Sequence, residues 1–450
     1  MSTHSSAPSG ARPAEVARLA AEAKRAAREL ASVPVIVKDR ALERIAVRLG
    51  ERETEILEAN ALDVGEAEKA VAGGMLAKPL LDRLRLDSSK LAGMIAGVRA
   101  VKALDDPSGK VLARTLLDDG LELRKVTCPL GLLAVIFESR PDAVTQISAL
   151  AIKSGNAVIL KGGREAARTT AVLVAAIREG LRDVPEVPEG VVESVADRAE
   201  VDALLALDGI VDLVIPRGSN ELVRSIQART RIPVLGHAEG VCHVYVDAAA
   251  DPEMAARIAL DAKLQYVAAC NAAETLLVHR DAAVRFLAPL LRTLGEAGIQ
   301  LRGCPESRRL APGVAMVEAT EADWRTEYSA PVLAVRVVES VDEAIAHVNE
   351  FGSGHTDTIV TEDATAAERF LERVDAAGVY HNASTRFADG YRYGFGAEVG
   401  ISTSKIHARG PVGLEGLVTT KYKLYGSGQV VADYSGPNAR PFLHRKLDKP

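Results

Sequence analysis

The chain has 450 residues, of which 48% are hydrophobic and 26% charged, as in a soluble globular protein of two or three domains. A net charge of −6 gives no basis for a nucleic acid or anionic membrane partner, and no segment approaches the ~18 uncharged apolar residues of a membrane helix. The four cysteines, Cys128, Cys242, Cys270 and Cys304, form no C-x-x-C pair, so no metal site is predicted. A reducing cytoplasm, where a free thiol survives, is the predicted location.

Helical periodicity dominates the first hundred residues. Residues 1–13 are rich in Ser, Pro and Gly, lack the apolar core of a signal peptide, and are predicted to be a flexible tail. Apolar residues recur at helical spacing over 14–30, and amphipathic helices are predicted at about 38–60 and 87–104. At 111–127 the turn Asp118-Asp119-Gly120 between apolar runs predicts a β-hairpin. The residues alone do not decide whether it projects towards another subunit or is a surface ribbon.

Residues 131–235 alternate between strand and helix patterns. Strands are predicted at 132–137, 157–160, 190–194, 210–215 and 234–235, with helices at 143–153 and 164–180. Short apolar strands separated by helices indicate a parallel sheet covered on both faces, with ligands at the carboxyl ends of its strands.

Two of these strand ends are cationic and rich in glycine. Lys161-Gly162-Gly163-Arg164 opens a helix, and Arg217-Gly218-Ser219 repeats the arrangement one βα unit later. Free N–H groups at a helix start and nearby positive charge suit phosphate, although plain strand-to-helix turns also carry glycine. The pair of turns favours a nucleotide cofactor, without the usual G-x-G-x-x-G.

A second alternating block runs from residue 242 to about 408 and contains a cysteine in a loop of small residues. Cys270 follows a predicted helix at 255–264 and precedes a predicted strand at 275–278, with Ala268, Ala269 and Ala272 around it. A thiol on such a loop is a candidate nucleophile, whereas an inert buried thiol is the commoner role of a free cysteine. The chain beyond about residue 435 is polar and predicted to be poorly ordered.

Three further segments carry polar side chains that could have either a functional or a structural role. His347 and the turn 352–357 could serve acid–base or metal chemistry, but glycine-flanked polar turns are usually structural. Asn382, Arg386 and Arg409 lie in predicted loops. Arginine binds carboxylate or phosphate through its planar guanidinium, although solvated arginines are the default.

Taken together, these segments resemble the γ-glutamyl phosphate reductase (glutamate-5-semialdehyde dehydrogenase) family, the proline-biosynthesis branch of the aldehyde dehydrogenase superfamily. The resemblance spans roughly residues 14–430. Its most specific segments are GLLAVIFESRP (131–141), SGNAVILKGG (154–163), IPRGS (215–219), GVCHVYVD (240–247), CNAAETLLV (270–278), AIAHVNEFGSGHTDTI (344–359) and HARGPVGLE (407–415). Val267 stands where the family has proline.

The resemblance implies an α/β, aldehyde dehydrogenase-like fold with a Rossmann-type cofactor domain, an α/β catalytic domain and a small oligomerisation element. Residues 14–110 and 128–240 match the cofactor domain and 241–409 the catalytic domain. Residues 111–127 and 410–450 match the oligomerisation element.

The resemblance also implies the chemistry. Cys270 falls on the nucleophile, whose thiolate attacks the γ-acyl phosphate, releases phosphate and leaves a thioester that hydride reduces to the aldehyde. The Cys270 backbone amide and an Asn side chain such as Asn271 are the implied oxyanion donors. Arg140, Asn382, Arg386 and Arg409 are the candidates for binding substrate anions.

Two positions refine the reaction and the cofactor. Oxidising relatives carry a water-activating glutamate, and its place falls at about Gly236, with Glu239 three residues later. A reductase needs no water. Arg164 stands where relatives that use NAD have a ribose-binding glutamate, so NADPH is the expected cofactor, held by Lys161, Gly162, Arg164, Arg217, Gly218 and Ser219. Glu327 resembles the glutamate that contacts the nicotinamide ribose.

The prediction is therefore an NADPH-dependent reductase of L-γ-glutamyl 5-phosphate, expected to form a homo-oligomer. The alternatives are a hydrolytic NAD(P)-dependent dehydrogenase of a small aldehyde and a non-catalytic family member. The resemblance leaves open an association with a glutamate kinase.

Overall fold

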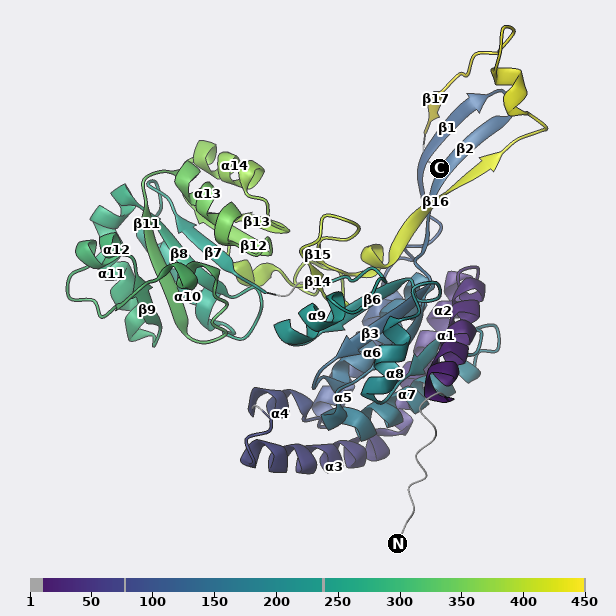
Figure 1. The fold of residues 1–450 in the computed structure, drawn as a ribbon, viewed down its shortest axis with the longest axis horizontal. Helices are drawn as coiled ribbons and strands as arrows, with labels where there is room; N and C mark the ends of the chain where they lie inside the picture. The colour runs from purple at the N-terminus through teal and green to yellow at the C-terminus, as the bar shows by residue number, and fades with distance from the viewer. Residues whose placement is uncertain (1–10, 77, 237–238, 449–450) are drawn as a thin grey trace. The chain divides into compact units, whose positions relative to one another are not determined.

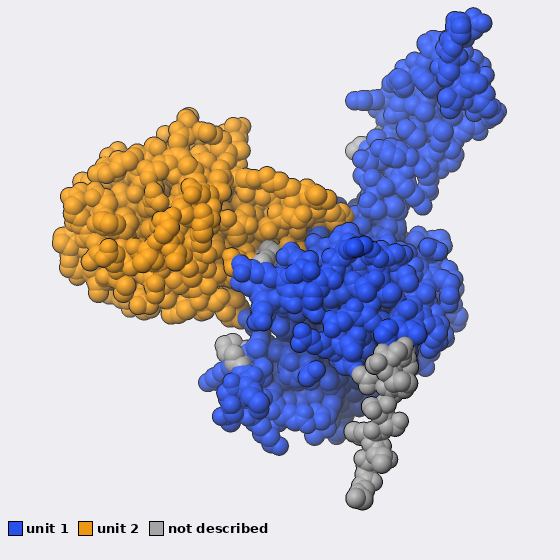
Figure 2. Space-filling model, in the orientation of Figure 1, with its two compact units in different colours: residues 1–235, 395–400, 412–450 blue, residues 236–394, 401–411 orange. Residues whose placement is uncertain are grey.

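The computed structural model describes residues 11–76, 78–236 and 239–448. The chain forms two compact units, coloured separately in Figure 2. Unit 1 contains the described residues up to Leu235, residues 395–400, and those from Val412 onward. Unit 2 contains the described residues of 236–394 and 401–411. Of the predicted tail, residues 1–10 lie outside the described residues, and Ala11 begins the first helix.

A parallel sheet forms the centre of unit 1 (Figure 1). Its order is β5-β4-β3-β6, with β3 (Leu132–Phe137), β4 (Ala157–Lys161), β5 (Val192–Ser194) and β6 (Leu213–Arg217). Val234 adds a single parallel bridge to Val214 in β6. Successive side chains of a strand point to opposite faces, and alternate residues such as Leu132, Ala134 and Ile136 share one apolar cluster with Ala20 of the first helix.

Unit 1 also contains helices that pack on this sheet and on one another. They are α1 (Ala11–Leu30), α2 (Val35–Glu51), α3 (Glu53–Ala72), α4 (Lys78–Leu84), α5 (Ser88–Ala103), α6 (Pro141–Ser154), η1 (Arg164–Ala166), α7 (Ala167–Arg182), α8 (Arg198–Leu205) and α9 (Asn220–Gln227). The single helix predicted at 38–60 is two helices, because the chain leaves helical geometry at Arg52. Gly180 lets α7 lie against α2, since a β-carbon there would stand 2.7 Å from the amide nitrogen of Ile45.

A separate antiparallel sheet in unit 1 contains the predicted hairpin. Its order is β16-β2-β1-β17, with β1 (Val111–Asp118), β2 (Leu121–Pro129), β16 (Val418–Tyr425) and β17 (Arg445–Leu447), and the helical turns η4 (Leu414–Leu417) and η5 (Val431–Tyr434) lie nearby in sequence. The prediction of poor order beyond residue 435 is wrong, because β17 pairs with the free edge of β1 through the register Arg114↔Leu447. Tyr434 adds a hydrogen bond of 2.8 Å from its hydroxyl to Oδ2 of Asp118.

Unit 2 is built on a seven-stranded sheet in which every neighbouring pair is parallel. Its order is β10-β9-β11-β8-β7-β12-β13 (Figure 1). The strands are β7 (Cys242–Val246), β8 (Ala273–His279), β9 (Gln300–Gly303), β10 (Val317–Glu318), β11 (Val332–Val338), β12 (Thr356–Val360) and β13 (Gly378–His381).

Helices pack on both faces of this sheet, because its central strands are buried on both sides. They are α10 (Pro252–Leu264), α11 (Arg280–Glu296), α12 (Pro305–Leu310), η2 (Glu321–Arg325), α13 (Val341–Phe351), α14 (Ala364–Arg373) and η3 (Thr385–Phe387), and a short ladder joins β14 (Ile401–Ser402) to β15 (Gly410–Pro411). Val244 and Val246 share an apolar cluster with α10 and α11, whereas Tyr245 between them packs with α13 and α14.

None of the helices in the described part of the chain is long and apolar enough to cross a bilayer.

Candidate active site

The loop that carries Cys270 joins α10 to the central strand β8. Helix α10 ends at Leu264, and the loop closes through two tight turns, with hydrogen bonds from the amide of Ala269 to the carbonyl of Tyr266 and from Ala272 to Ala269. Cys270 is half-buried, and its carbonyl accepts a 3.4 Å hydrogen bond from the thiol of Cys242. Burial raises the pKa of the Cys242 thiol, so Cys242 stays neutral beside the more accessible Cys270.

Gly240 ties the Cys270 loop to Glu327. A β-carbon at Gly240 would stand 2.7 Å from Cα of Cys270, so the two backbones are in direct contact. The amide of Gly240 donates to Oε2 of Glu327 at 3.0 Å. The predicted nucleophile and the predicted ribose-binding carboxylate are therefore joined through a single glycine.

Arg386 brings a buried positive charge near Cys270. Only 8% of it is exposed, and its Nε donates to Oε1 of Gln265 at 2.8 Å. Burial lowers the pKa of Arg386, and the charge of Arg392 lowers it further. Cys270 acts in the opposite direction, so Arg386 lies within electrostatic range of Cys270. The described residues provide no carboxylate at ion-pair distance, so the guanidinium can receive a substrate anion.

Asn271 connects the nucleophile loop to the segment that carries Arg386. The side-chain Nδ2 of Asn271 donates to the backbone carbonyl of Ala388 at 2.9 Å. The backbone carbonyl of Asn271 accepts from the hydroxyl of Thr385 at 2.7 Å. The amide group has a second N–H, and Oδ1 is buried without a partner among the described residues. The side chain therefore fixes η3 beside Cys270 in addition to its predicted role as an oxyanion donor.

The other candidates for binding substrate anions are engaged elsewhere. The side-chain amide of Asn382 makes hydrogen bonds of 3.0 and 2.9 Å with the backbone N–H and carbonyl of Thr361. Arg409 pairs with Asp375 at 3.0 Å and also donates to the backbone carbonyl of Asp375. Arg140 belongs to unit 1, where it pairs with Asp142 at 3.1 Å.

The carboxyl ends of β3, β4 and β6 form the second predicted site, in unit 1. Because the strands are parallel neighbours with Ile136 beside Lys161 and Phe137 beside Arg217, the two cationic turns meet at one edge of the sheet. Arg217 donates to the backbone carbonyl of Glu398 at 3.4 Å.

Two carboxylates share this edge with the cations. The amide of Ser219 donates to Oε2 of Glu138 at 2.8 Å, and the amide of Ser139 donates to Glu165 at 2.7 Å. Gly218 allows this approach, because a β-carbon there would stand 2.7 Å from the carboxyl carbon of Glu138. The start of α9 thus already holds an internal anion, a feature that the sequence analysis missed.

Lys161 and Arg164 supply the positive charge at this edge. Burial lowers the pKa of Lys161, against the opposing effects of Glu165 and Glu138, while Arg164 is exposed. A β-carbon at Gly162 would stand 2.8 Å from the hydroxyl of Thr170, so this turn keeps its backbone close to α7. The exposed guanidinium of Arg164 lies beside a turn of two glycines, whose backbone has no side chains to keep a ligand away. This arrangement suits the phosphate groups of a nucleotide.

The histidines near the 352–357 turn form an internal polar cluster. Nδ1 of His243 lies 2.9 Å from Oδ1 of Asp357, and His347 accepts a hydrogen bond of 3.1 Å from Arg336. Nδ1 of His355 lies 2.9 Å from the hydroxyl of Thr356. These side chains are buried, which favours the structural interpretation. Within the described residues, no group of three or more His, Cys, Asp or Glu side chains is arranged to hold a metal ion.

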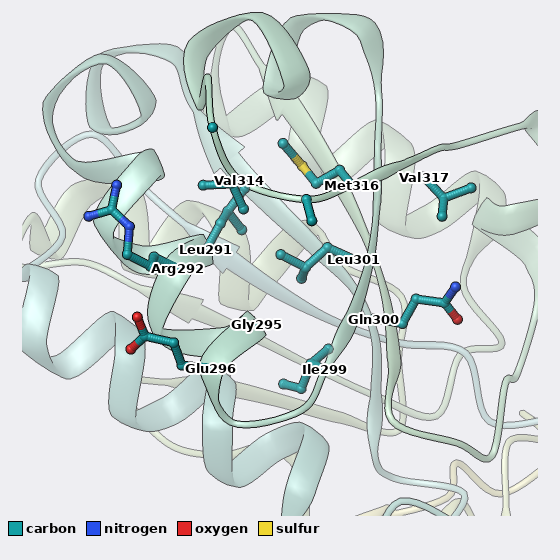
Figure 3. A pocket seen from close by; sticks show the side chains of 12 residues that line it. Leu291, Arg292, Gly295, Glu296, Ile299, Gln300, Leu301, Val314, Met316 and Val317 are labelled. Carbon is teal, nitrogen blue, oxygen red and sulfur yellow. The ribbon is translucent and has the colours of Figure 1, made fainter.

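A cavity of about 670 Å³ opens elsewhere in unit 2 (Figure 3). Apolar side chains such as Leu291, Leu301 and Met316 line it, with Arg292 and Glu296 at one side. Its lining includes no cysteine and no predicted site residue, so the active-site hypothesis stays with Cys270.

Comparisons with known proteins show the family of the chain. The model of the aldehyde dehydrogenase family matches residues 3–302 and 297–421. A γ-glutamyl phosphate reductase of Synechococcus sp. (strain JA-3-3Ab) is 57% identical over 423 residues, covering 94% of this chain and 92% of that protein.

Solved structures are also similar to this chain. The crystal structure of γ-glutamyl phosphate reductase from Thermotoga maritima superposes with a TM-score of 0.88 at 41% identity, covering 92% of this chain and 99% of that one. A glyceraldehyde-3-phosphate dehydrogenase from Methanocaldococcus jannaschii, solved in complex with NADP, has a TM-score of 0.63 at 18% identity and covers 92% of this chain and 95% of its own, a likeness of fold.

Proposed function

The chain belongs to the aldehyde dehydrogenase family and, within it, to the γ-glutamyl phosphate reductases, and from that membership we propose that it reduces L-γ-glutamyl 5-phosphate to L-glutamate 5-semialdehyde and phosphate in proline biosynthesis. The predicted family, the α/β fold and the oxidoreductase class are confirmed. The observation that carries the proposed reaction is the half-buried residue Cys270 within electrostatic range of the buried cation Arg386, which has no ion-pair partner among the described residues.

Cys270 forms the covalent intermediate. Its sulfur attacks the γ-carbonyl carbon, a C–S bond forms, the bond from that carbon to the phosphate oxygen breaks, and phosphate leaves. Arg386 attracts the negative charge of the substrate before the attack and that of the departing phosphate after it. The backbone N–H of Cys270 and the second N–H of Asn271 are the donors for the oxyanion.

A nicotinamide dinucleotide is the family's cofactor, and we assign NADPH. When bound, the nicotinamide supplies the hydride that reduces the acyl carbon held on Cys270. Lys161 and Arg164 would hold the adenosine side, with Arg164 facing a 2′-phosphate, and Glu327 would hold the nicotinamide ribose. The backbone of Gly162 and the side chain of Arg217 complete the predicted binding edge. Gly218 and Ser219 would join it only if the cofactor displaced Glu138, which already accepts the amide of Ser219.

Water has no activating group at the position that oxidising relatives use. Gly236 has no side chain, so it cannot take a proton from a water molecule that would hydrolyse the thioester. The acyl group on Cys270 therefore awaits reduction, and the sulfur departs when the aldehyde is released.

The antiparallel sheet of unit 1 is the proposed oligomerisation element. Tyr422, Leu424 and Tyr425 of β16 are exposed, as are Val430 and Val431 beyond it. Large apolar groups exposed on one sheet suit contact with a second copy. Tyr422→Lys with Leu424→Lys should reduce the molecular mass measured by light scattering, and an unchanged mass would contradict this role.

The reverse reaction tests the function. Glutamate 5-semialdehyde should reduce NADP only when phosphate or arsenate is present, and more efficiently than it reduces NAD. Cys270→Ala should abolish turnover while NADPH still binds in calorimetry. Oxidation undiminished without phosphate would indicate the hydrolytic alternative, and appreciable activity in Cys270→Ala would overturn the assignment.

A further inference from the structure

A buried ion pair closes the base of the Cys270 loop. Lys263 lies in the last turn of α10 and Glu274 is the second residue of β8, so the loop between them contains Cys270. Nζ of Lys263 lies 2.5 Å from Oε2 of Glu274, and both side chains are 0% exposed. The pair joins the entry and the exit of the nucleophile loop.

The same carboxylate reaches the Glu327 segment. The backbone N–H of Tyr328 stabilises the charged form of Glu274, and Nζ of Lys263 lies 5.8 Å from the centre of the Tyr328 ring. The adjacent Glu327 accepts the amide of Gly240, whose backbone touches Cys270. A continuous series of contacts therefore runs from the ion pair through Glu327 and back to the nucleophile.

Stability alone does not account for this pair. Removing two charges from water is unfavourable, and well-packed apolar side chains of similar volume commonly replace buried ion pairs without loss of stability. Oε1 of Glu274 is also buried without a partner among the described residues. What the pair supplies, and an apolar pair cannot, is a directional contact that fixes two segments at one distance.

We propose that Lys263 and Glu274 are positioning residues that hold Cys270 and Glu327 in their mutual arrangement for acyl transfer and reduction. The proposal rests on the proposed function, because it takes Cys270 as the nucleophile. Neither residue touches the reacting atoms, and both act through the loop and through the segment 327–328.

The charge state of Glu274 gives the pair a pH signature. Burial raises the pKa of Glu274 to about 7, against the opposing effect of Lys263, and Glu327 raises it further. The groups that face it are Lys263 from α10, Glu327 and the neutral phenol of Tyr328 from the segment after η2, and the neutral thiol of Cys242 from β7. Burial also lowers the pKa of Lys263, so both partners are shifted towards their neutral forms. Acidification protonates Glu274 and removes its attraction to the Lys263 ammonium.

The test separates positioning from simple stabilisation in the full-length enzyme. Lys263→Met should lower both the unfolding temperature and kcat of the phosphate-dependent reaction, because Glu274 is left buried and unpaired. The double variant Lys263→Met with Glu274→Met should recover the unfolding temperature while kcat stays at least 10-fold low and KM for NADP rises. If kcat recovers together with the unfolding temperature, the pair is structural only and the proposal is overturned.

Glu274→Gln provides a second test, because glutamine keeps the shape of the side chain and removes its charge. The decline of kcat below pH 7 in the wild type should be absent or displaced in this variant, and an unchanged pH profile would overturn the proposal. The matched control is Lys153→Met, which removes a buried lysine from a part-buried ion pair, at 2.6 Å from Asp39 in unit 1, and should lower the unfolding temperature without changing the profile. Activity retained in Cys270→Ala would instead contradict the proposed function itself.

Discussion

The backbone of Gly240 lies against that of Cys270 so closely that a β-carbon on Gly240 would stand 2.7 Å from Cα of Cys270. Real β-carbons essentially never approach another atom to within 3.0 Å. The contact involves two backbones, so no flexible side chain can move aside to relieve it.

Gly240→Ala should therefore displace the nucleophile loop and weaken the 3.0 Å hydrogen bond from Gly240 to Glu327. We expect kcat to fall by about 100-fold or more, equivalent to about 2.7 kcal/mol of activation free energy. The control is Gly97→Ala in α5, where no atom lies within 4 Å of the new β-carbon. That variant should gain up to about 1 kcal/mol of stability and keep its activity. A Gly240→Ala enzyme with normal kcat would contradict the contact.

Arg386 should contribute more to substrate binding than Arg409. A hydrogen bond to a charged group contributes about 1.5–3 kcal/mol, so Arg386→Gln should raise KM for phosphate or semialdehyde by about 10- to 100-fold. Arg409→Gln is the comparison, because Arg409 is already paired with Asp375. Steady-state kinetics in the reverse direction measure both, and a larger effect at Arg409 would reverse the assignment.

Arg164 should set the choice between the two nicotinamide dinucleotides. Arg164→Glu places a carboxylate where a 2′-phosphate would lie, so the NADPH/NADH ratio of kcat/KM should fall at least 10-fold, about 1.4 kcal/mol. Arg168→Gln, four residues further on, is the control, since Arg168 is bound to Glu66 at 2.7 Å and to Asp63 at 3.2 Å. Equal ratios in wild type and Arg164→Glu would exclude this role.

His347 should make stability fall in acid. Burial lowers its pKa from 6.5 to about 2, with His243 and Arg336 adding to the shift. Below pH 6.5 the unfolded chain takes up a proton that the native His347 does not, so the unfolding free energy should decrease by about 1.4 kcal/mol per pH unit from this group. Urea unfolding at pH 7, 6 and 5 measures the slope.

His347→Gln should make that slope shallower, because glutamine does not titrate and can still accept from Arg336. The exposed His444 is the matched control, and His444→Gln should leave the slope as in the wild type. A slope in His347→Gln as steep as in the wild type would mean that another group controls acid unfolding.

Local patterns predict most of the secondary structure. The strands β3, β4 and β8 contain the short apolar runs that predict them, because a strand buried on both faces is mostly apolar. Helix boundaries are less well predicted, as at Arg52, where the apolar periodicity continues across a break in the backbone. The order beyond residue 435 depends on the edge of β1, more than 300 residues away in sequence, and so has no local signal.

The sequence by itself determined the family, the alternation of strands and helices, and Cys270 as the candidate nucleophile, because these depend on residue types at fixed spacing. Only the tertiary structure decided which polar groups surround that thiol. It placed Arg386 near Cys270, engaged Asn382 and Arg409 with other partners, and brought Gly240 and Glu327 against the loop. The physical reason is that electrostatic and hydrogen-bonding interactions depend on the distance between groups in space. The order of the strands in the sheet sets that distance for residues that are far apart in the sequence.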